Sequence, residues 1–226
     1  MYLKKTEMCM CGIFAYLGSK EASKECLNGL KKLEYRGYDS AGLATLHSQE
    51  IHVCKHVGKV HALEKALDRH PLQGLLAIAH TRWATHGIPS QDNAHPHLDQ
   101  NKTVAVVHNG IIENYHQLKQ TLIKDKGISF SSDTDTEVIA QLIPLYYEGN
   151  FLEACLKSLP SLEGSFALAI LHKDHPDELI ATAEKNPLIV GWDEASKDCY
   201  VTSDVNALSS PHVKLYFLAQ VPQYLS

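Results

Sequence analysis

Apolar positions along the chain form short runs and helical stripes, which predict strands and helices grouped in blocks. Short apolar runs predict buried strands at Ile13–Leu17, Leu43–Leu46, Ile51–His56, Leu75–His80, Thr103–His108, Ser165–Leu171, Leu179–Ala183, Leu188–Trp192 and Tyr200–Thr202. Apolar residues at helical spacing predict helices over Lys20–Leu33, His61–Leu67, Ile112–Lys124, Glu137–Tyr147 and Phe151–Leu159. We expect Ser19 and Thr134 to cap the first and fourth helices. Because helices and strands do not alternate strictly, the pattern favours an α+β layered domain with antiparallel sheets.

The length and composition of the chain narrow the class of protein. With 226 residues, a hydrophobic share of 44% and no internal repeat or linker, the chain is expected to form one domain. A net charge of -5 gives no reason to expect nucleic acid or a membrane as a partner. No apolar run approaches the roughly 20 residues of a membrane span. Six cysteines without a secretory signal predict reduced thiols and a cytoplasmic location.

The 14 histidines raise the question of a metal site. Two of them lie in the segment Asn93-Ala94-His95-Pro96-His97, but a proline separates them in an expected loop. Neither a Cys-x-x-Cys nor a His-Glu-x-x-His pattern completes a set of ligands. No glycine-rich phosphate loop is present either. We therefore expect no metal and no other cofactor.

A cysteine directly after a methionine, in Met10-Cys11-Gly12, is a candidate nucleophile. If Met10 is the start and is trimmed, Cys11 carries both a thiol and a free α-amine. That amine titrates near roughly 8, so part of it is neutral at cellular pH and can accept the thiol proton. If residues 1–10 stay attached, the amine is an amide and cannot act as the base. The plain alternative is a buried structural cysteine.

Two clusters near predicted strands contain an arginine. The segment Tyr35–Gly42 places Arg36 between glycine-flexed aromatic residues, where it can orient a thiolate, although a surface turn is the simpler interpretation. The segment His80–Gly87 places Arg82 directly after a buried strand. A guanidinium matches a carboxylate in a bidentate manner, so this cluster suits the α-carboxylate of an amino acid. The alternative is a tryptophan anchor with solvated polar neighbours.

Two further clusters offer an oxyanion hole and a carboxylate. In Val107–Ile111, the side-chain amide of Asn109 and the N–H of Gly110 can point at a developing negative oxygen, although Asn-Gly is also a strong hairpin signal. In Ser131–Glu137, a carboxylate can pair with a substrate ammonium, although the segment is also an ordinary capping signal.

Taken together, these segments resemble the class II glutamine amidotransferases, whose glutaminase domain begins with a nucleophilic cysteine. The resemblance is strongest to the glutaminase domains of the glutamine–fructose-6-phosphate aminotransferases. The segments that carry it are Cys11–Tyr16, Leu33–Gly42, His80–Gly87, Asn93–His97, Val107–Tyr115 and Thr134–Val138. They occur in the order of the family and span nearly the whole chain.

The resemblance implies a fold: a four-layer αββα sandwich of two antiparallel sheets, of the N-terminal nucleophile hydrolase type. It also implies a reaction, in which L-glutamine is hydrolysed to glutamate and ammonia through a cysteine thioester. The implied catalytic residues are Cys11, Arg36, Asn109 and Gly110. The implied substrate-binding residues are Arg82, Trp83, Thr85, His86 and Asp135. Within this set, Arg82, Thr85 and His86 would hold the α-carboxylate, Asp135 the α-amino group, and Trp83 the exit to the ammonia path.

The resemblance has departures, which bear on the domain organisation. Residues 1–10 are expected to be an extension that is removed or untranslated in the active form, and 11–226 the glutaminase domain. Asn186-Pro187-Leu188 stands where a Gly-Ser-Pro-Leu type of turn is expected, and the segment Phe217–Pro222 lacks an expected acidic-glycine turn and strand. The sugar isomerase domains that would accept the ammonia are absent from this sequence.

Three functions remain open from the sequence. The first is the glutaminase half of a synthase that makes glucosamine 6-phosphate from fructose 6-phosphate. The second is the glutaminase of another class II enzyme, such as amidophosphoribosyltransferase or asparagine synthetase, against which the segment Tyr35–Asp39 speaks. The third is a catalytically silent module that binds glutamine, if residues 1–10 are retained. The sequence does not predict the oligomeric state.

Overall fold

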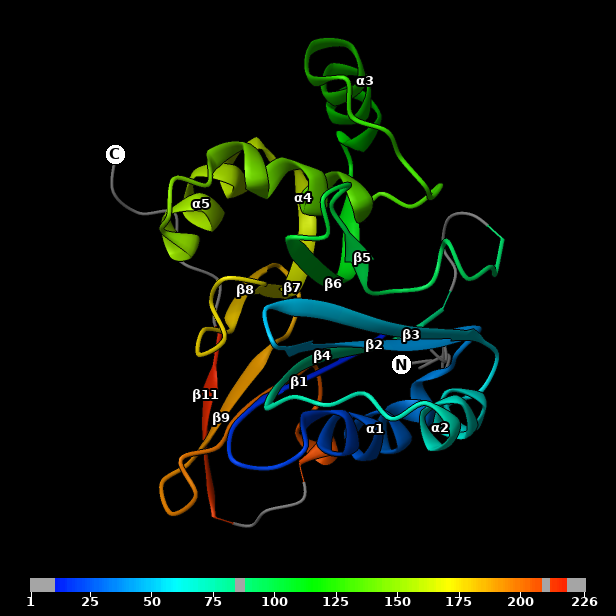
Figure 1. The fold of residues 1–226 in the computed structure, drawn as a ribbon, viewed down its shortest axis with the longest axis vertical. Coiled ribbons are helices and arrows are strands. Elements are labelled where there is room, and N and C mark those ends of the chain that lie inside the picture. The colour runs from blue at the N-terminus through cyan, green and yellow to red at the C-terminus, as the bar shows by residue number, and fades with distance from the viewer. Residues whose placement is uncertain (1–10, 84–87, 209–211, 219–226) are drawn as a thin grey trace, which may run out of the picture.

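A computed structural model describes residues 11–83, 88–208 and 212–218. These residues form two antiparallel sheets that lie one above the other, with helices on the outer side of each (Figure 1). The strands of the seven-stranded sheet follow the order β11-β9-β10-β1-β4-β2-β3, and those of the four-stranded sheet the order β5-β6-β7-β8. The predicted four-layer αββα sandwich is therefore confirmed.

The larger sheet contains β1 (Gly12–Leu17), β2 (Ser40–His47), β3 (Glu50–Val57), β4 (Leu76–Arg82), β9 (Ile189–Asp193), β10 (Cys199–Thr202) and β11 (Val213–Phe217). The smaller sheet contains β5 (His97–Leu98), β6 (Val104–Ile112), β7 (Gly164–His172) and β8 (Ile180–Glu184). The helices are α1 (Ala22–Leu33), α2 (Val60–Arg69), α3 (Tyr115–Lys126), α4 (Glu137–Leu142) and α5 (Phe151–Ser158). Short 3-10 turns cover Glu34–Arg36, Ile143–Tyr146, Leu159–Ser161 and Val205–Ala207.

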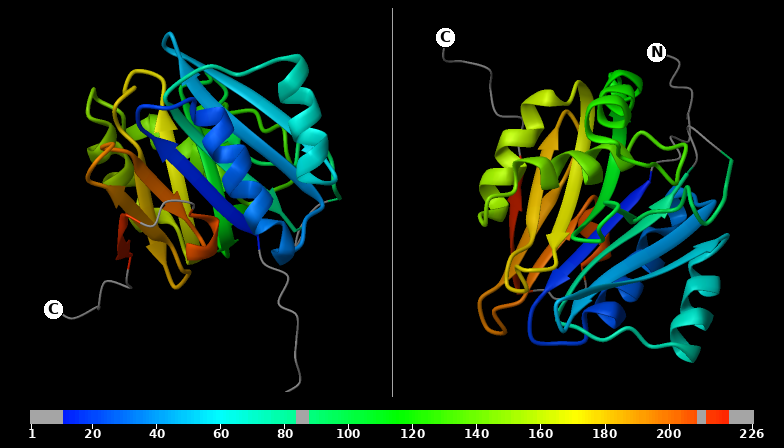
Figure 2. Two further views of the ribbon diagram at one scale, coloured as in Figure 1. Left: turned by 90° about the horizontal axis from the view of Figure 1, so that it is seen from below. Right: turned by 45° about the horizontal axis from the view of Figure 1, so that its top comes forward.

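Three apolar layers hold the sandwich together. The middle layer joins the facing sides of the two sheets, with Ile13 and Ile78 from the larger sheet and Val107 and Ala169 from the smaller one. Helices α1 and α2 cover the outer face of the larger sheet, as Figure 2 shows from below. Helices α4 and α5 cover the outer face of the smaller sheet, whereas α3 projects from the body of the molecule (Figure 1). Removal of these apolar surfaces from water is the main stabilising term for such layers.

Both predicted helix caps are wrong because the two side chains have other partners. The N–H and Oγ of Ser19 donate to Asp198 Oδ1, at 2.8 and 3.0 Å, and α1 begins later, at Ala22. The Thr134 hydroxyl lies 3.0 Å from both Ser132 Oγ and His97 Nε2, and α4 begins only after Thr136.

Several element boundaries also differ from the predicted ones, and two of them differ most. The strand predicted to end at His108 continues as β6 to Ile112, because residues 109–112 stay paired with β7. The helix predicted to continue to Tyr147 gives way after Leu142 to a 3-10 turn that contains Pro144, which has no N–H to donate. The strands β5 and β11 were not predicted, since one has two residues and the other lies at a sheet edge with mostly exposed side chains.

The central strands place the candidate residues near one another. In the larger sheet Gly12 of β1 pairs with Thr81 of β4, so Cys11 lies beside the end of β4, where Arg82 and Trp83 follow. In the smaller sheet β6 brings Asn109 and Gly110 toward the same region, and β6 contacts both β1 and β4. No helix among the described residues has the length and apolar character needed to cross a membrane.

Candidate active site

The Cys11 thiol is held by the backbone of Trp83. The Trp83 N–H donates to Cys11 Sγ at 3.2 Å, and Sγ lies 3.5 Å from the Trp83 carbonyl oxygen, to which it donates. Burial raises the pKa of the Cys11 thiol, while the Trp83 backbone and the Arg82 charge act in the opposite direction. The thiol is therefore mostly protonated near neutral pH, and its reaction as a nucleophile requires a base.

The side-chain amide of Asn109 lies directly beside Cys11. Its Nδ2 donates to the Cys11 carbonyl at 3.1 Å, and its Oδ1 lies 2.9 Å from His80 Nε2. Since β6 continues through this position, the hairpin alternative for Asn109-Gly110 is wrong. The amide therefore presents its N–H groups toward the residue that carries the thiol, as an oxyanion hole requires.

Gly110 occupies a backbone position that only glycine suits. Its φ is 134°, a conformation that other residues rarely adopt. A Cβ there would also collide with the carbonyl oxygen of Ser165 and come within 2.7 Å of Asn186 Nδ2. Asn186 donates from the same Nδ2 to the Asn109 carbonyl at 3.4 Å. The peptide between Asn109 and Gly110 thus has its carbonyl turned toward the Asn186 side chain, and its N–H, being trans, points away from it.

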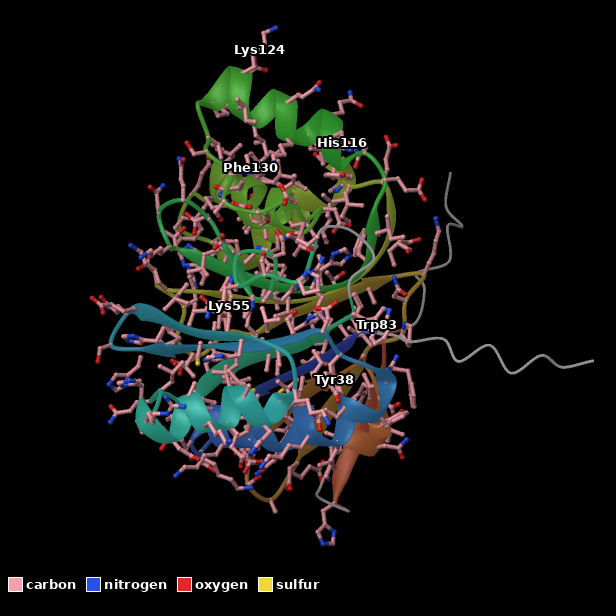
Figure 3. All side chains as sticks on the ribbon, turned by 90° about the vertical axis from the view of Figure 1, so that its right-hand side faces the viewer. Tyr38, Lys55, Trp83, His116, Lys124 and Phe130 are labelled. Atoms are coloured by element: carbon pink, nitrogen blue, oxygen red, sulfur yellow. The ribbon has the colours of Figure 1, made fainter. Side chains whose placement is uncertain are left out.

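Arg82 is a buried cation at the end of β4. Its Nη1 lies 3.9 Å from Asp39 Oδ1, an oxygen that also accepts the Ser40 hydroxyl at 2.8 Å. The Asp39 N–H in turn donates to the Arg82 carbonyl at 2.7 Å. The Trp83 side chain, which follows, is exposed, and Figure 3 shows it at the level where the two halves of the sandwich meet, with Tyr38 below it.

Asp135 lies on the loop that precedes α4. Its Oδ2 accepts the N–H of Ile112, the last residue of β6, at 2.8 Å. Asn93 connects this loop to the segment after β4, because it accepts the Asp133 N–H at 2.9 Å and donates to the Ile88 carbonyl at 3.0 Å. The structure therefore links Asp135 to the strand that carries Asn109.

Among the described residues, Arg36 contacts Ser203 and Asp204 rather than Cys11 itself. Its Nη1 donates to the Ser203 carbonyl at 3.2 Å and lies 3.4 Å from Asp204 Oδ2. Ser203 in turn exchanges hydrogen bonds with the backbone of Ile13, two residues after Cys11. Arg36 thus holds the segment beside the start of β1. The predicted residues Thr85 and His86 lie outside the described residues.

Four buried histidines, His80, His95, His97 and His108, lie near one another on β4, β5, β6 and the segment before β5, and the predicted site did not include them. The rings of His80 and His95 stack at 4.1 Å, and that of His97 meets His95 edge-on at 4.7 Å. Burial lowers the pKa of all four, so they are neutral near pH 7. Within the described ranges, no group of three or more His, Cys, Asp or Glu side chains is arranged to hold a metal ion.

A family model described as "Glutamine amidotransferase domain" matches residues 80–210, which is more than half of the chain. The chain belongs to the glutamine amidotransferase family. Among curated relatives, the glutamine–fructose-6-phosphate aminotransferase (isomerizing) of Chlamydia abortus is 52% identical over 200 residues, which are 88% of this chain and 32% of that protein. The same enzyme of Clostridium acetobutylicum is 49% identical over 209 residues, 92% of this chain and 34% of that protein.

This glutamine amidotransferase domain spans about a third of the length of those curated relatives. Among solved structures, the glutamine phosphoribosylpyrophosphate amidotransferase of B. subtilis is similar, with a TM-score of 0.77 and 28% identity. The match covers 91% of this chain and 44% of that one. Identity to the fructose-6-phosphate aminotransferases is thus much higher than to this phosphoribosylpyrophosphate amidotransferase. The resemblance inferred from the six sequence segments is confirmed.

Proposed function

We propose that this domain hydrolyses the side-chain amide of L-glutamine through a thioester on Cys11 and supplies the ammonia to a sugar-phosphate isomerase domain. The observation that carries the proposal is the contact of the Asn109 amide with the backbone of Cys11, at 3.1 Å. It places a neutral hydrogen-bond donor next to a thiol that burial keeps protonated.

The reaction divides into two acyl transfers. With Cys11 as the first residue, its α-amine accepts the thiol proton, and sulfur attacks the side-chain amide carbon of glutamine. The amide oxygen becomes negative and is stabilised by Asn109 Nδ2 and the Gly110 N–H. The tetrahedral adduct collapses, the amine returns the proton to the leaving nitrogen, and ammonia departs. Water then attacks the thioester with the amine again as the base, which yields glutamate and the free thiol.

The α-carboxylate and α-ammonium groups of glutamine would be bound by side chains of opposite charge. Arg82 offers a guanidinium to the α-carboxylate, and Asp135 offers a carboxylate to the α-ammonium group. Among the described residues, Asp135 accepts a hydrogen bond from Ile112, on Oδ2, which leaves acceptor capacity on its carboxylate. Thr85 and His86 are proposed to complete the carboxylate site, and Trp83 is proposed to border the path that ammonia takes.

The choice of a sugar phosphate as the final acceptor rests on the identity of about half the residues to the aminotransferases. A chimaera tests it, in which residues 11–226 replace the corresponding part of the Chlamydia abortus enzyme. We expect synthesis of glucosamine 6-phosphate from fructose 6-phosphate with either glutamine or ammonium. A Cys11→Ser chimaera should retain only the ammonium-dependent synthesis. Glutamine hydrolysis without transfer to the sugar, in a chimaera that still uses ammonium, would contradict the assigned acceptor.

A further inference from the structure

His80 contacts the oxyanion residue Asn109 rather than the nucleophile. It lies on β4, is 1% exposed, and its Nε2 is 2.9 Å from Asn109 Oδ1. The Asn109 amide makes its other side-chain contact through Nδ2, with the Cys11 carbonyl at 3.1 Å. His80 therefore binds the end of the amide opposite the one that faces Cys11.

These two contacts fix which imidazole nitrogen carries the proton. A carbonyl oxygen only accepts, so the atom of Asn109 that faces the Cys11 carbonyl has to be the NH₂ group. The atom that faces His80 is then Oδ1, which needs a donor, so His80 carries its proton on Nε2. In the other tautomer, His80 Nε2 carries no proton and can only accept a hydrogen bond. The Asn109 amide would then favour the rotated orientation, with its NH₂ group toward His80. Its Oδ1 would face Cys11, and its N–H donors would no longer point into the site.

The surroundings hold the ring in this state. Burial lowers the pKa of His80 to about 3, so one proton is present throughout the physiological range. The ring of His95 stacks on it at an interplanar angle of 15°. His95 is itself fixed, because its Nδ1 accepts the His108 N–H at 3.3 Å and its Nε2 lies 3.4 Å from Thr136 Oγ1. His80 thus has little freedom to rotate.

We infer that His80 is a positioning residue, which holds the Asn109 amide with its N–H groups toward the reacting carbonyl through the Nε2–H tautomer. The inference rests on the proposed hydrolysis of glutamine and goes beyond it. His80 touches neither substrate nor thiol in this account, so it acts on the rate through Asn109. A preorganised donor lowers the transition-state energy because it needs no reorientation when charge develops.

The experiment compares side chains that place a donor at different points, in the form that begins with Cys11. His80→Gln places an amide N–H near the position of Nε2, and His80→Asn is polar but too short to reach. We expect kcat to stay within about threefold of the parent in the first and to fall at least about tenfold in the second, with KM little changed in both. His172→Asn is the matched control, since His172 is also 1% exposed and lies on β7 away from these contacts.

A double-mutant cycle separates positioning from general structural damage. In an Asn109→Ala background, His80→Asn should have no further effect on kcat, because the amide that it orients is gone. An equal loss of kcat in both backgrounds, or unchanged kcat in His80→Asn, would overturn the inference.

Nitrogen-15 NMR of the full chain reports the tautomer without an activity assay. Protonation of His80 on Nδ1 would also overturn the inference, whereas Nε2–H supports it. Failure of the parent enzyme to hydrolyse glutamine would instead count against the proposed function, and the NMR result would remain.

Discussion

In the proposed site, the end that would react with the glutamine amide and the end that would bind its α-carboxylate and α-ammonium groups are built from different kinds of groups. They are called the reacting end and the binding end. At the reacting end, Cys11, His80 and Asn109 are all neutral, because burial raises the pKa of the thiol and lowers that of the imidazole. At the binding end, Arg82 and Asp135 carry charge, and Arg82 lies 3.9 Å from Asp39. Cys11 is partly buried and the other four side chains are buried, but only the binding end places ionised side chains next to the proposed substrate.

This difference separates two kinds of contribution to rate. Charges that meet the α-carboxylate and α-ammonium groups interact equally with the substrate and the transition state, so they lower KM. Neutral donors beside the reacting carbonyl interact most strongly once its oxygen becomes negative, so they raise kcat. Substitutions at the two ends should therefore change different kinetic constants.

The largest effect is expected from the nucleophile itself. Cys11→Ser should lower glutaminase activity on the order of 10⁴-fold or more, because the sulfur forms the covalent intermediate. A diazo-ketone analogue of glutamine should label Cys11 and none of the other cysteines, which are Cys9, Cys26, Cys54, Cys155 and Cys199. Cys54→Ser is the control, since Cys54 is a half-buried thiol on β3 and its loss should leave activity intact. Peptide mass mapping that finds the label only on Cys9 would refute the assignment.

The next effect tests the reacting end. Asn109→Ala should lower kcat about 10²–10³-fold with little change in KM, the size seen when an oxyanion donor is lost. Asn114→Ala is the control, because this amide also makes two hydrogen bonds, to Ser161 and Glu163, but lies outside the site. Steady-state kinetics on glutamine give both constants. Normal kcat with a raised KM in Asn109→Ala would place this residue at the binding end instead.

The binding end should respond in the opposite way. Arg82→Lys and Asp135→Asn should each raise KM about 10–100-fold, because hydrogen bonds to charged groups contribute roughly 1.5–3 kcal/mol, with smaller changes in kcat. Asn at position 135 still accepts the Ile112 N–H, so the loop should keep its structure. Arg69→Lys, an exposed exchange on α2, serves as the control. A fall in kcat without a rise in KM would remove the distinction between the two ends.

The smallest effect near pH 7 is expected from the protonation of the four buried histidines. They change the free energy of unfolding, and they do so in acid. Their folded pKa values lie below the unfolded value of roughly 6.5, so the unfolded chain binds more protons below that pH. The contribution of each histidine to the free energy of unfolding is therefore fully present above about pH 6.5. It falls as the pH decreases below that value, by up to about 1.4 kcal/mol per pH unit for each histidine.

Urea unfolding at pH 7.5 and pH 5.5 measures this loss. We expect His97→Gln to remove about one histidine's share of the difference, since a glutamine does not titrate. A free energy of unfolding that is unchanged between the two pH values would contradict the neutral character of the reacting end.

Much of the fold can be predicted from the local pattern of hydrophobic residues. The strands β1, β4 and β7 contain continuous apolar runs. The helices α2 and α5 each have a clear apolar face. The errors arose where tertiary contacts took over a local signal. Ser19 has the chemistry of a cap, but Asp198, far along the chain, binds both its N–H and its hydroxyl. In the same way, the Asn109-Gly110 pair has the sequence of a hairpin and continues as a strand, because β7 pairs with it.

The candidate site could be predicted from residues whose chemistry is visible in the sequence, such as Cys11, Arg82 and Asn109. His80 and Asn186 were not selected, because their importance lies in contacts with Asn109 that join separate strands and turns. The one local signal for His80 is the alternation along β4, which places it on the opposite face from Thr81 and on the same face as Arg82. Nothing local distinguishes Asn186 from an ordinary turn residue.

The proposed mechanism depends on the α-amine of Cys11 as the general base. The contacts of the thiol support this, because within the described residues Cys11 Sγ forms its two hydrogen bonds with the backbone of Trp83 rather than with a side chain that titrates. A peptide nitrogen cannot accept the proton, since its lone pair is delocalised into the amide.

The measurement that tests the claim most directly is ammonia release from glutamine by two purified forms, residues 1–226 and residues 11–226, each verified by intact mass. We expect the form beginning at Cys11 to be faster by about 10²–10⁴-fold, the usual contribution of general-base catalysis. Equal activity with residues 1–10 demonstrably attached would contradict it, and a side chain such as His80, His86 or His108 would then have to supply the base.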